Sequence, residues 1–189
     1  MKIIKEYDWK EVNWRQLNVG DSIQLPSFTV PGVTIDGIEK PHFERLKIRD
    51  TATVYKVTDD EAHLVFNHVL FESVMDCNNI VDWKKTQLYD YLSDTFINAM
   101  QDWLIPVSTV SLLSREDIFG EDALPFFKIG KNRIAFKKDE FYPEKYCLKS
   151  KTSKPYSCIV SIDGNAYYNY MLTTKASVRP CFTVKIDEQ

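Results

Sequence analysis

Histidine and cysteine are the side chains best suited to bind metals or act as nucleophiles, and both are sparse in this chain. The sequence has three histidines and four cysteines: His42, His63, His68, Cys77, Cys147, Cys158 and Cys181. No two cysteines have the C-x-x-C spacing of a zinc knuckle or a redox motif. His63 and His68 lie five residues apart on a predicted strand and its exit, so their side chains point to opposite faces. A zinc site is therefore not expected.

The sequence also lacks the usual motifs of catalysis and cofactor binding. It contains no G-x-G-x-x-G, no Walker loop and no G-x-S-x-G elbow. Asp163-Gly164-Asn165 could suggest calcium, but an EF-hand loop needs further oxygen ligands and a closing Glu, which the following residues do not supply. A cysteine–histidine nucleophile pair stays open, because such partners can be distant in sequence. We expect no catalytic residue, no metal and no cofactor.

A group of tyrosines near the C-terminus provides the first candidates for binding. On a strand, Tyr168 and Tyr170 should share one face while Tyr167 takes the other. One set could be core and the other exposed, and exposed tyrosines beside Asn169 would suit recognition. The favoured alternative is that all of them are partly buried sheet residues with hydrated hydroxyls. Tyr168, Asn169 and Tyr170 are thus candidate binding residues.

Arg179 is the fourth candidate. Pro180 fixes its own φ and pushes Arg179 toward an extended backbone. If Val178 points inward, Arg179 should lie on the outer face of the strand or at the sheet edge. Its guanidinium could pair with a carboxylate or bridge backbone carbonyls, or it could read an anionic ligand. The structural role is favoured because no phosphate loop or second basic residue lies close by in sequence.

The composition limits the class of protein. The chain has 189 residues, of which 44% are hydrophobic and 27% charged, as expected for one globular domain. Its net charge is -3, which gives no support for nucleic-acid binding. The N-terminal MKIIKEYDWKEVNW has no apolar stretch typical of a signal peptide, and no apolar run could span a bilayer. We expect reduced cysteines, no membrane partner, and a location in the cytoplasm of the producing cell or in a virion assembled there.

The elements that must position these residues begin with strands. Residues 52–57 and 62–66 alternate with period two around a Thr-Asp-Asp-Glu turn, which predicts a hairpin. Before them, Pro26 to Pro41 reads as a long broken loop. Near the other end, residues 159–162 and 166–170 flank an Asp-Gly turn and predict a second hairpin. Residues 178–184 predict an edge or terminal strand, because Pro180 cannot donate to a ladder.

Helices are expected in the middle of the chain. From Trp83 to Leu104, apolar residues recur every three or four positions and predict one buried face. The residues of this face are Leu88, Leu92, Phe96, Met100 and Trp103. Asp82 is the expected N-cap and Pro106 the stop, and a short helix should begin at the capping box of Ser114 and Asp117 and close at Gly120. The order predicts an α+β domain, mainly antiparallel, with one long and one short helix.

Four segments together resemble a widespread family of bacterial and phage domains of unknown function. Its pattern W-x-x-S-x-L-R-x-x-L-N-x-x-F is similar to residues 83–96, and its L-L-S-x-x-E segment to residues 112–117. Its Y-W-L-R-S segment resembles residues 146–150, and its closing V-x-x-x-G and G-V-R-P-A resemble residues 160–164 and 177–181. The order and spacing agree over roughly residues 50 to 186. The resemblance implies a fold related to C-type-lectin-like domains and formylglycine-generating enzymes, with residues 51–189 as that domain and 1–50 as an extension packed on it.

The resemblance implies a binding scaffold with variable loops. We therefore expect a non-enzymatic recognition or assembly module, such as a phage virion, tail or surface-binding protein. Its partners would be proteins, which include virion proteins and further copies of itself, and a carbohydrate ligand is also open. The stretches from Pro26 to Pro41 and from Phe136 to Ser157 are the expected display loops. Two alternatives are a small phage inhibitor of a host defence enzyme, for which the acidic balance is suitable, and a divergent enzyme of the formylglycine-generating type.

Overall fold

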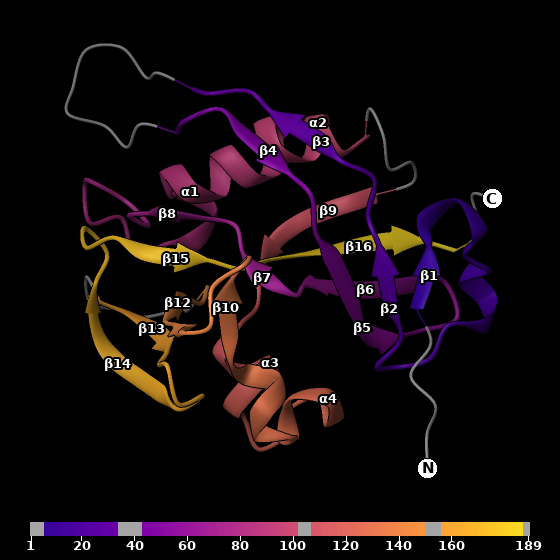
Figure 1. The fold of residues 1–189 in the computed structure, drawn as a ribbon. Helices are drawn as coiled ribbons and strands as arrows, with labels where there is room; N and C mark the ends of the chain where they lie inside the picture. Colours follow the sequence, from indigo (N-terminus) through magenta and orange to yellow (C-terminus); the bar gives the residue numbers. More distant parts are fainter. Residues whose placement is uncertain (1–5, 34–42, 102–106, 150–155, 187–189) are drawn as a thin grey trace.

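The computed structural model describes residues 6–33, 43–101, 107–149 and 156–186, and it has a mixed α+β fold (Figure 1). The largest sheet has six strands in the order β1 (Glu6–Asp8), β2 (Ser22–Gln24), β5 (Thr51–Val57), β6 (Glu61–Phe66), β16 (Pro180–Lys185) and β9 (Val107–Leu112). The predicted hairpin of β5 and β6 is confirmed, with a bulge at Tyr55. Since β2 pairs with β5, residues on both sides of position 50 build this sheet. The division there stays a prediction.

Three smaller sheets complete the described part of the fold. The five-stranded sheet has the order β14 (Ala166–Met171), β13 (Tyr156–Val160), β12 (Tyr146–Cys147), β15 (Ala176–Val178) and β8 (Phe71–Ser73). The others are β11 (Pro143–Glu144), β10 (Ala135–Lys137) and β7 (His68–Val69), and the pair of β3 (Phe28–Val30) and β4 (Leu46–Ile48). Pairing is mainly antiparallel, as predicted, and the parallel pairs are β1–β2, β7–β10 and β12–β15. The second predicted hairpin is β13–β14.

The long helical segment differs in detail from the uniform helix that the sequence predicts. It consists of a 3-10 turn η3 (Trp83–Lys85), α1 (Gln87–Asp90), a π-helical stretch η4 (Tyr91–Phe96) and α2 (Ile97–Gln101). Asp82 caps only the 3-10 turn, and Thr86 caps α1 by accepting a hydrogen bond from the backbone N–H of Tyr89 at 3.2 Å. The wider π turn still leaves the predicted face buried. Trp103 and the predicted stop at Pro106 lie outside the described residues.

The short helix follows its sequence signal closely. It is α3 (Arg115–Phe119), and Ser114 and Asp117 form the reciprocal capping box. Gly120 ends it, and a Cβ there would lie 2.7 Å from the carbonyl oxygen of Glu116. Further short helices not predicted from the sequence are α4 (Pro125–Lys128) and the 3-10 turns η1 (Trp9–Glu11), η2 (Trp14–Gln16) and η5 (Gly130–Arg133).

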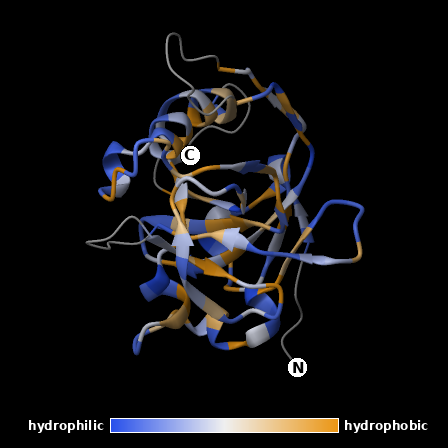
Figure 2. Cartoon of the chain, turned by 90° about the vertical axis from the view of Figure 1, so that its left-hand side faces the viewer, coloured by the Kyte–Doolittle hydropathy of each residue, from blue (hydrophilic) through white to orange (hydrophobic). Residues whose placement is uncertain are grey.

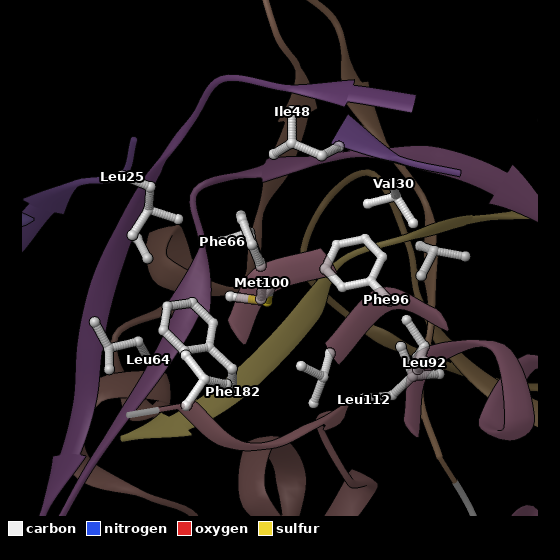
Figure 3. Packing of buried hydrophobic residues seen from close by; sticks show 14 of the residues in the cluster. Leu25, Val30, Ile48, Leu64, Phe66, Leu92, Phe96, Met100, Leu112 and Phe182 are labelled. Carbon is white, nitrogen blue, oxygen red and sulfur yellow. The ribbon is translucent and has the colours of Figure 1, made fainter. Parts of the chain in front are cut away.

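Two apolar clusters lie on opposite faces of the six-stranded sheet. Val54, Leu64 and Phe66 contribute to the cluster under the long helix, together with its residues Leu92 and Phe96 (Figure 3). The alternate residues Tyr55 and Val65 contribute to the second cluster, which α3 and α4 cover with Ile118 and Phe127. The predicted helix face is confirmed, because Leu88, Leu92, Phe96 and Met100 have no exposed surface. Hydrophobic residues follow the inner strands, and hydrophilic ones the outer loops (Figure 2).

Two strand predictions are wrong. The C-terminal strand β16 is not at an edge but lies between β6 and β9. A central position is possible because Pro180, which cannot donate a backbone hydrogen bond, occupies the first position of the strand. Arg179 separates β16 from β15, which belongs to the five-stranded sheet. The stretch from Pro26 to Pro41 is not only loop, because it contains β3, whose residues Phe28 and Val30 are buried against the long helix. Residues 28–30 form a strand because they pair with β4, a contact that the local turn residues could not predict.

Candidate functional site

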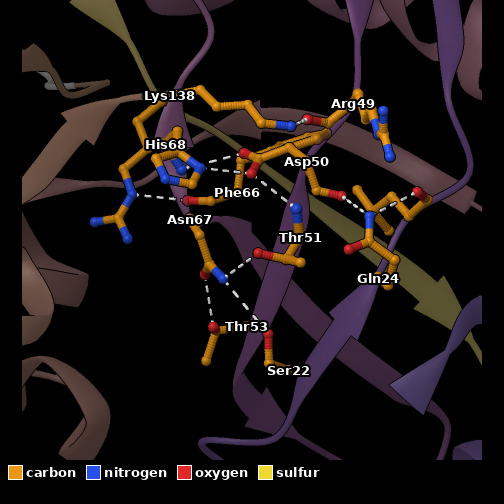
Figure 4. Close-up of polar contacts among 12 residues, drawn as sticks. Ser22, Gln24, Arg49, Asp50, Thr51, Thr53, Phe66, Asn67, His68 and Lys138 are labelled. Carbon is orange, nitrogen blue, oxygen red and sulfur yellow. Dashed lines mark hydrogen bonds and ion pairs between the residues drawn. The ribbon is translucent and has the colours of Figure 1, made fainter. Parts of the chain in front are cut away.

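A network of polar side chains joins the ends of β4, β5, β6 and β7 (Figure 4). Asp50 is 4% exposed, and its carboxylate accepts hydrogen bonds from the backbone N–H groups of Thr51 and His68 at 2.8 and 3.1 Å. It also contacts the Nδ1 atom of His68 at 2.6 Å. The buried carboxylate of Asp50 therefore links the start of β5 to the start of β7 and orients the imidazole of His68.

Asn67 extends this network to side chains of β2 and β5. Its side-chain oxygen accepts a hydrogen bond from the Thr53 hydroxyl at 2.6 Å, and its amide nitrogen donates to the hydroxyls of Thr51 and Ser22 at 2.6 and 3.4 Å. Each part of the Asn67 amide is thus hydrogen-bonded within the protein. The network ties β2 to β5 and to the exit of β6 (Figure 4).

An aspartate that orients a histidine is the arrangement of a general base, so the second ring nitrogen decides its chemistry. The His68 side chain is 31% exposed. Within the described part of the chain, no hydrogen bond is found at its Nε2 atom. Because the Asp50 carboxylate also accepts from two backbone N–H groups, the pair links the start of β5 to the start of β7. From the sequence, the histidines were candidates for a metal site and for a cysteine–histidine pair, and the pairing of His68 with Asp50 was not predicted.

The cysteines are placed unfavourably for nucleophilic chemistry. Burial raises the pKa of the Cys147 thiol to about 12 and the pKa values of Cys158 and Cys181 to about 11. A nucleophilic or metal-binding cysteine needs a thiolate near neutral pH. Cys77 is half-buried. Among the residues described, no group of three metal-ligating side chains comes together.

Arg179 does not lie on an outer face or at a sheet edge, as its sequence context predicts, but is 5% exposed. The chain passes from one sheet to another at this residue, so its side chain points into the interior between them. Its Nε donates to the carbonyl oxygen of Phe66 at 2.8 Å, and its Nη1 contacts the carbonyl oxygen of Asn132 and the hydroxyl of Tyr146 at 3.3 and 3.4 Å. The contacts are those of a bridge between backbone carbonyls, the structural role that the sequence favoured.

The tyrosines of β14 do not have the facing that the sequence predicts. Ile159 pairs with Tyr167 and Ser157 with Tyr170, so two residues of β14 lie opposite one residue of β13. This bulge reverses the alternation, and Tyr167 and Tyr170 share a face while Tyr168 points the other way. Tyr168 is 50% exposed and accepts a hydrogen bond from Arg115 at 3.3 Å.

The two remaining candidates on β14 have different surroundings. The Tyr170 hydroxyl donates to the carbonyl oxygen of Lys175 at 2.5 Å, and the Lys145 ammonium lies 5.0 Å from the ring centre. Asn169 is exposed. The structure therefore does not bring Tyr168, Tyr170 and Arg179 together into one site. Their role in binding stays a prediction.

Among the described residues, the most exposed aromatic side chains lie elsewhere, at the tip of the β10–β11 hairpin. Phe141 is 93% exposed and Tyr142 80% exposed. The turn is closed by a hydrogen bond from the backbone N–H of Glu140 to the carbonyl oxygen of Lys137 at 3.1 Å, and Asp139 has a φ of 66°. We call residues 138–142 the aromatic tip. Single exposed hydrophobic residues are normal on protein surfaces, whereas these two adjacent rings together form a small apolar patch.

Ion pairs hold the base of this hairpin. The Lys137 ammonium lies 3.2 Å from a carboxylate oxygen of Glu72 on β8 and 3.5 Å from one of Glu144 on β11. The contact with Glu72 is the main cause that raises the pKa of Lys137, followed by the charge of Glu144. Lys138 also donates to the carbonyl oxygen of Arg49. The hairpin is thus attached to β8 and to the β4–β5 corner, while its aromatic tip projects into solvent.

A groove of about 660 Å³ runs beside the hairpin. Its walls include Phe43 and Phe71 together with the charged residues Lys137, Glu140 and Lys175. The sequence placed a display loop at residues 136–157, and the structure finds β11, β12 and parts of β10 and β13 within that range. The rings themselves were missed, although two aromatic residues between acidic residues and Pro143 are a signal that could have found them.

Comparisons with known proteins do not assign the chain to a family. No family model, no curated protein and no solved structure matches it. In the part of the chain that the structure describes, no helix has the length and apolar character needed to cross a membrane. The features that bear on function are therefore those of the protein surface itself.

Proposed function

We propose that this protein is a non-enzymatic recognition or assembly module that binds another protein through the aromatic tip of the β10–β11 hairpin. The observation that carries the proposal is the exposure of Phe141 and Tyr142, at 93% and 80%. Aromatic side chains supply much of the binding energy at protein interfaces when they enter a pocket on the partner. Left in water, the same rings contribute nothing to the stability of the chain.

The charge around the tip favours a protein partner over nucleic acid or an anionic membrane. Residues 137–145 contain three lysines and three carboxylates: Lys137, Lys138, Lys145, Asp139, Glu140 and Glu144. Such a neutral segment provides no long-range attraction to phosphates. Mixed charges around an apolar centre are instead typical of a protein interface with a polar rim. The groove beside the hairpin offers a second surface for the same partner.

Two features of the buried side chains favour a non-enzymatic role. The raised pKa values of the buried cysteines disfavour thiolate chemistry. The Asp50 carboxylate that orients His68 also binds two backbone N–H groups, which favours a structural role for the pair. Both features give the side chains a role in the scaffold.

We also propose that the scaffold is related to the family that the sequence motifs resemble. We propose a C-type-lectin-like arrangement in which strands, one long helix, a strand and a short helix precede the final sheet. In its support, residues of the matching motifs occupy the interior, among them Leu92, Phe96, Tyr146 and Arg179. The motifs thus describe how the domain packs, whereas the aromatic tip lies outside all of them.

The test compares the wild-type protein with the double variant Phe141→Ser, Tyr142→Ser. Because both rings are exposed, the variant should unfold at the same temperature as the wild type. Partners that co-purify with the tagged wild type from the producing cells are identified by native mass spectrometry, and affinities are then measured with the purified partner. Loss of an aromatic anchor should weaken binding by roughly 30-fold or more, which corresponds to about 2 kcal/mol.

A matched control replaces exposed apolar side chains elsewhere, in the variant Ile162→Ser, Tyr167→Ser. These residues are 58% and 53% exposed. Binding that is unchanged in the control and lost in the tip variant supports the proposal. Equal affinity of both variants for the partner, or a wild-type protein that stays a lone monomer, contradicts it. Sedimentation of the purified protein identifies the case in which the partner is a second copy.

A further inference from the structure

A second cleft lies on the opposite side of β5 from the long helix, between this strand and the segment that contains α4 and η5. Its volume is about 800 Å³. This is within the range of roughly 300–1,000 Å³ that is common for small-molecule sites. None of the residues that line the cleft belongs to the β10–β11 hairpin.

Apolar side chains form most of the wall. Tyr55 and Val57 contribute from β5, and Phe126 and Ile129 from α4 and the residue after it. The ring of Tyr55 is 8% exposed and packs 5.6 Å from that of Phe127, centre to centre. Ile129, in contrast, is 53% exposed at the rim. The wall is thus suited to a flat apolar group inserted between strand and helix.

Polar groups lie along one side of the cleft. They belong to Ser22, Thr53 and Asn67, the outer end of the network in Figure 4. The Thr53 hydroxyl donates to Asn67, and the Ser22 hydroxyl accepts from it, so Ser22 keeps its own proton free to donate. The Ser22 hydroxyl can therefore donate a hydrogen bond to an acceptor on a ligand.

The charged side chains that line the cleft are all positive. Lys56 and Lys131 are lining residues, and no aspartate or glutamate lines the cleft. Both lysines are exposed, and neither makes an ion pair among the residues that the structure describes. In a chain whose net charge is -3, this cleft is a local positive site. Two unpaired ammonium groups beside an apolar wall attract an anionic group on an apolar body.

We propose that this cleft binds a small amphipathic anion, that is, an aromatic or similarly flat apolar molecule with one carboxylate, sulfonate or phosphate group. The apolar body lies between Tyr55 and Phe126, and the anionic group meets Lys56, Lys131 and the Ser22 hydroxyl. The site is independent of protein recognition by the aromatic tip, so either proposal can fail without the other.

Two fluorescent probes that share an aromatic body test this directly. 8-Anilinonaphthalene-1-sulfonate carries a sulfonate, and N-phenyl-1-naphthylamine has the same rings without the charge. Titrated into the folded protein, the sulfonate should bind saturably at one site and at least ten-fold more tightly than the neutral probe. Equal affinities, or fluorescence that does not saturate, would overturn the proposal.

Variants then locate the site. Lys56→Gln with Lys131→Gln should weaken the sulfonate at least ten-fold and leave the neutral probe unchanged, whereas the control Lys10→Gln with Lys47→Gln should affect neither. Ile129→Asp should weaken both probes, because it places a carboxylate at the apolar rim. All three variants change exposed side chains, so their melting temperatures should match the wild type. A sulfonate affinity that is the same in the Lys56 and Lys131 variant as in the control rules out this cleft as the site.

Discussion

Replacing Arg179 by lysine should destabilise the protein although the positive charge is kept. The guanidinium makes three hydrogen bonds, to the carbonyl oxygens of Phe66 and Asn132 and to the hydroxyl of Tyr146. It also lies 5.4 Å from the centre of the Tyr146 ring. These groups come from β6, η5 and β12, so one side chain joins three elements. A lysine ammonium lacks the planar fork and cannot meet all three acceptors.

The size of the loss in stability depends on the hydrogen-bond acceptors that lysine leaves without a donor. A hydrogen bond to a charged group contributes about 1.5–3 kcal/mol, and a buried acceptor without a donor carries a similar penalty. The contact with Phe66 is fully buried, whereas the Asn132 carbonyl is partly accessible to water and should cost less. We expect a loss of about 2–4 kcal/mol in the free energy of unfolding. For a chain of this length, that lowers the melting temperature by roughly 5–15 °C.

Urea and thermal unfolding of Arg179→Lys measure this loss, and Arg115→Lys is the control. Arg115 contacts Tyr168 at the surface, with 41% of its side chain exposed, so its replacement should cost less than about 0.5 kcal/mol. A double-mutant cycle with Tyr146→Phe should give a coupling energy of about 1 kcal/mol. An Arg179→Lys variant as stable as the wild type would refute the structural role. If such a variant also lost partner binding, Arg179 would instead read an anionic ligand.

Two further predictions concern the core and the dependence of stability on pH. Phe96→Ala should lower the free energy of unfolding by about 3–5 kcal/mol, because it leaves a cavity under the long helix. The control Asn98→Ala, on the exposed face of the helix, should cost less than about 0.5 kcal/mol. Similar urea midpoints for the two variants would contradict the packing. Burial, and then the charge of Lys56, lowers the pKa of His63, so the unfolded chain binds the proton more readily than the folded one. The free energy of unfolding should therefore fall as the pH drops through the ordinary histidine pKa of about 6.5, and His63→Gln should reduce this slope when urea midpoints are compared between pH 5 and 7.

Features that depend on short stretches of chain were predictable from the sequence. The face of Leu88, Leu92 and Phe96 follows from helical spacing, and the capping box of Ser114 and Asp117 joins residues three positions apart. The two hairpins follow from alternation around a turn. In each case the physical cause is local, since side-chain direction and backbone hydrogen bonding are set by neighbours within one or two turns.

Features that depend on contacts between distant residues were decided only by the tertiary structure. The burial of Arg179 depends on Phe66, 113 residues earlier in the chain. The facing of Tyr168 and Tyr170 depends on one extra residue in the register with β13, which no alternation pattern reveals. The exposure of Phe141 depends on where Lys137 meets Glu72 on β8. Residue types determined which segments were apolar and which could turn. Whether a ring or a guanidinium lies in water or in the interior was determined by the segments that pack against it.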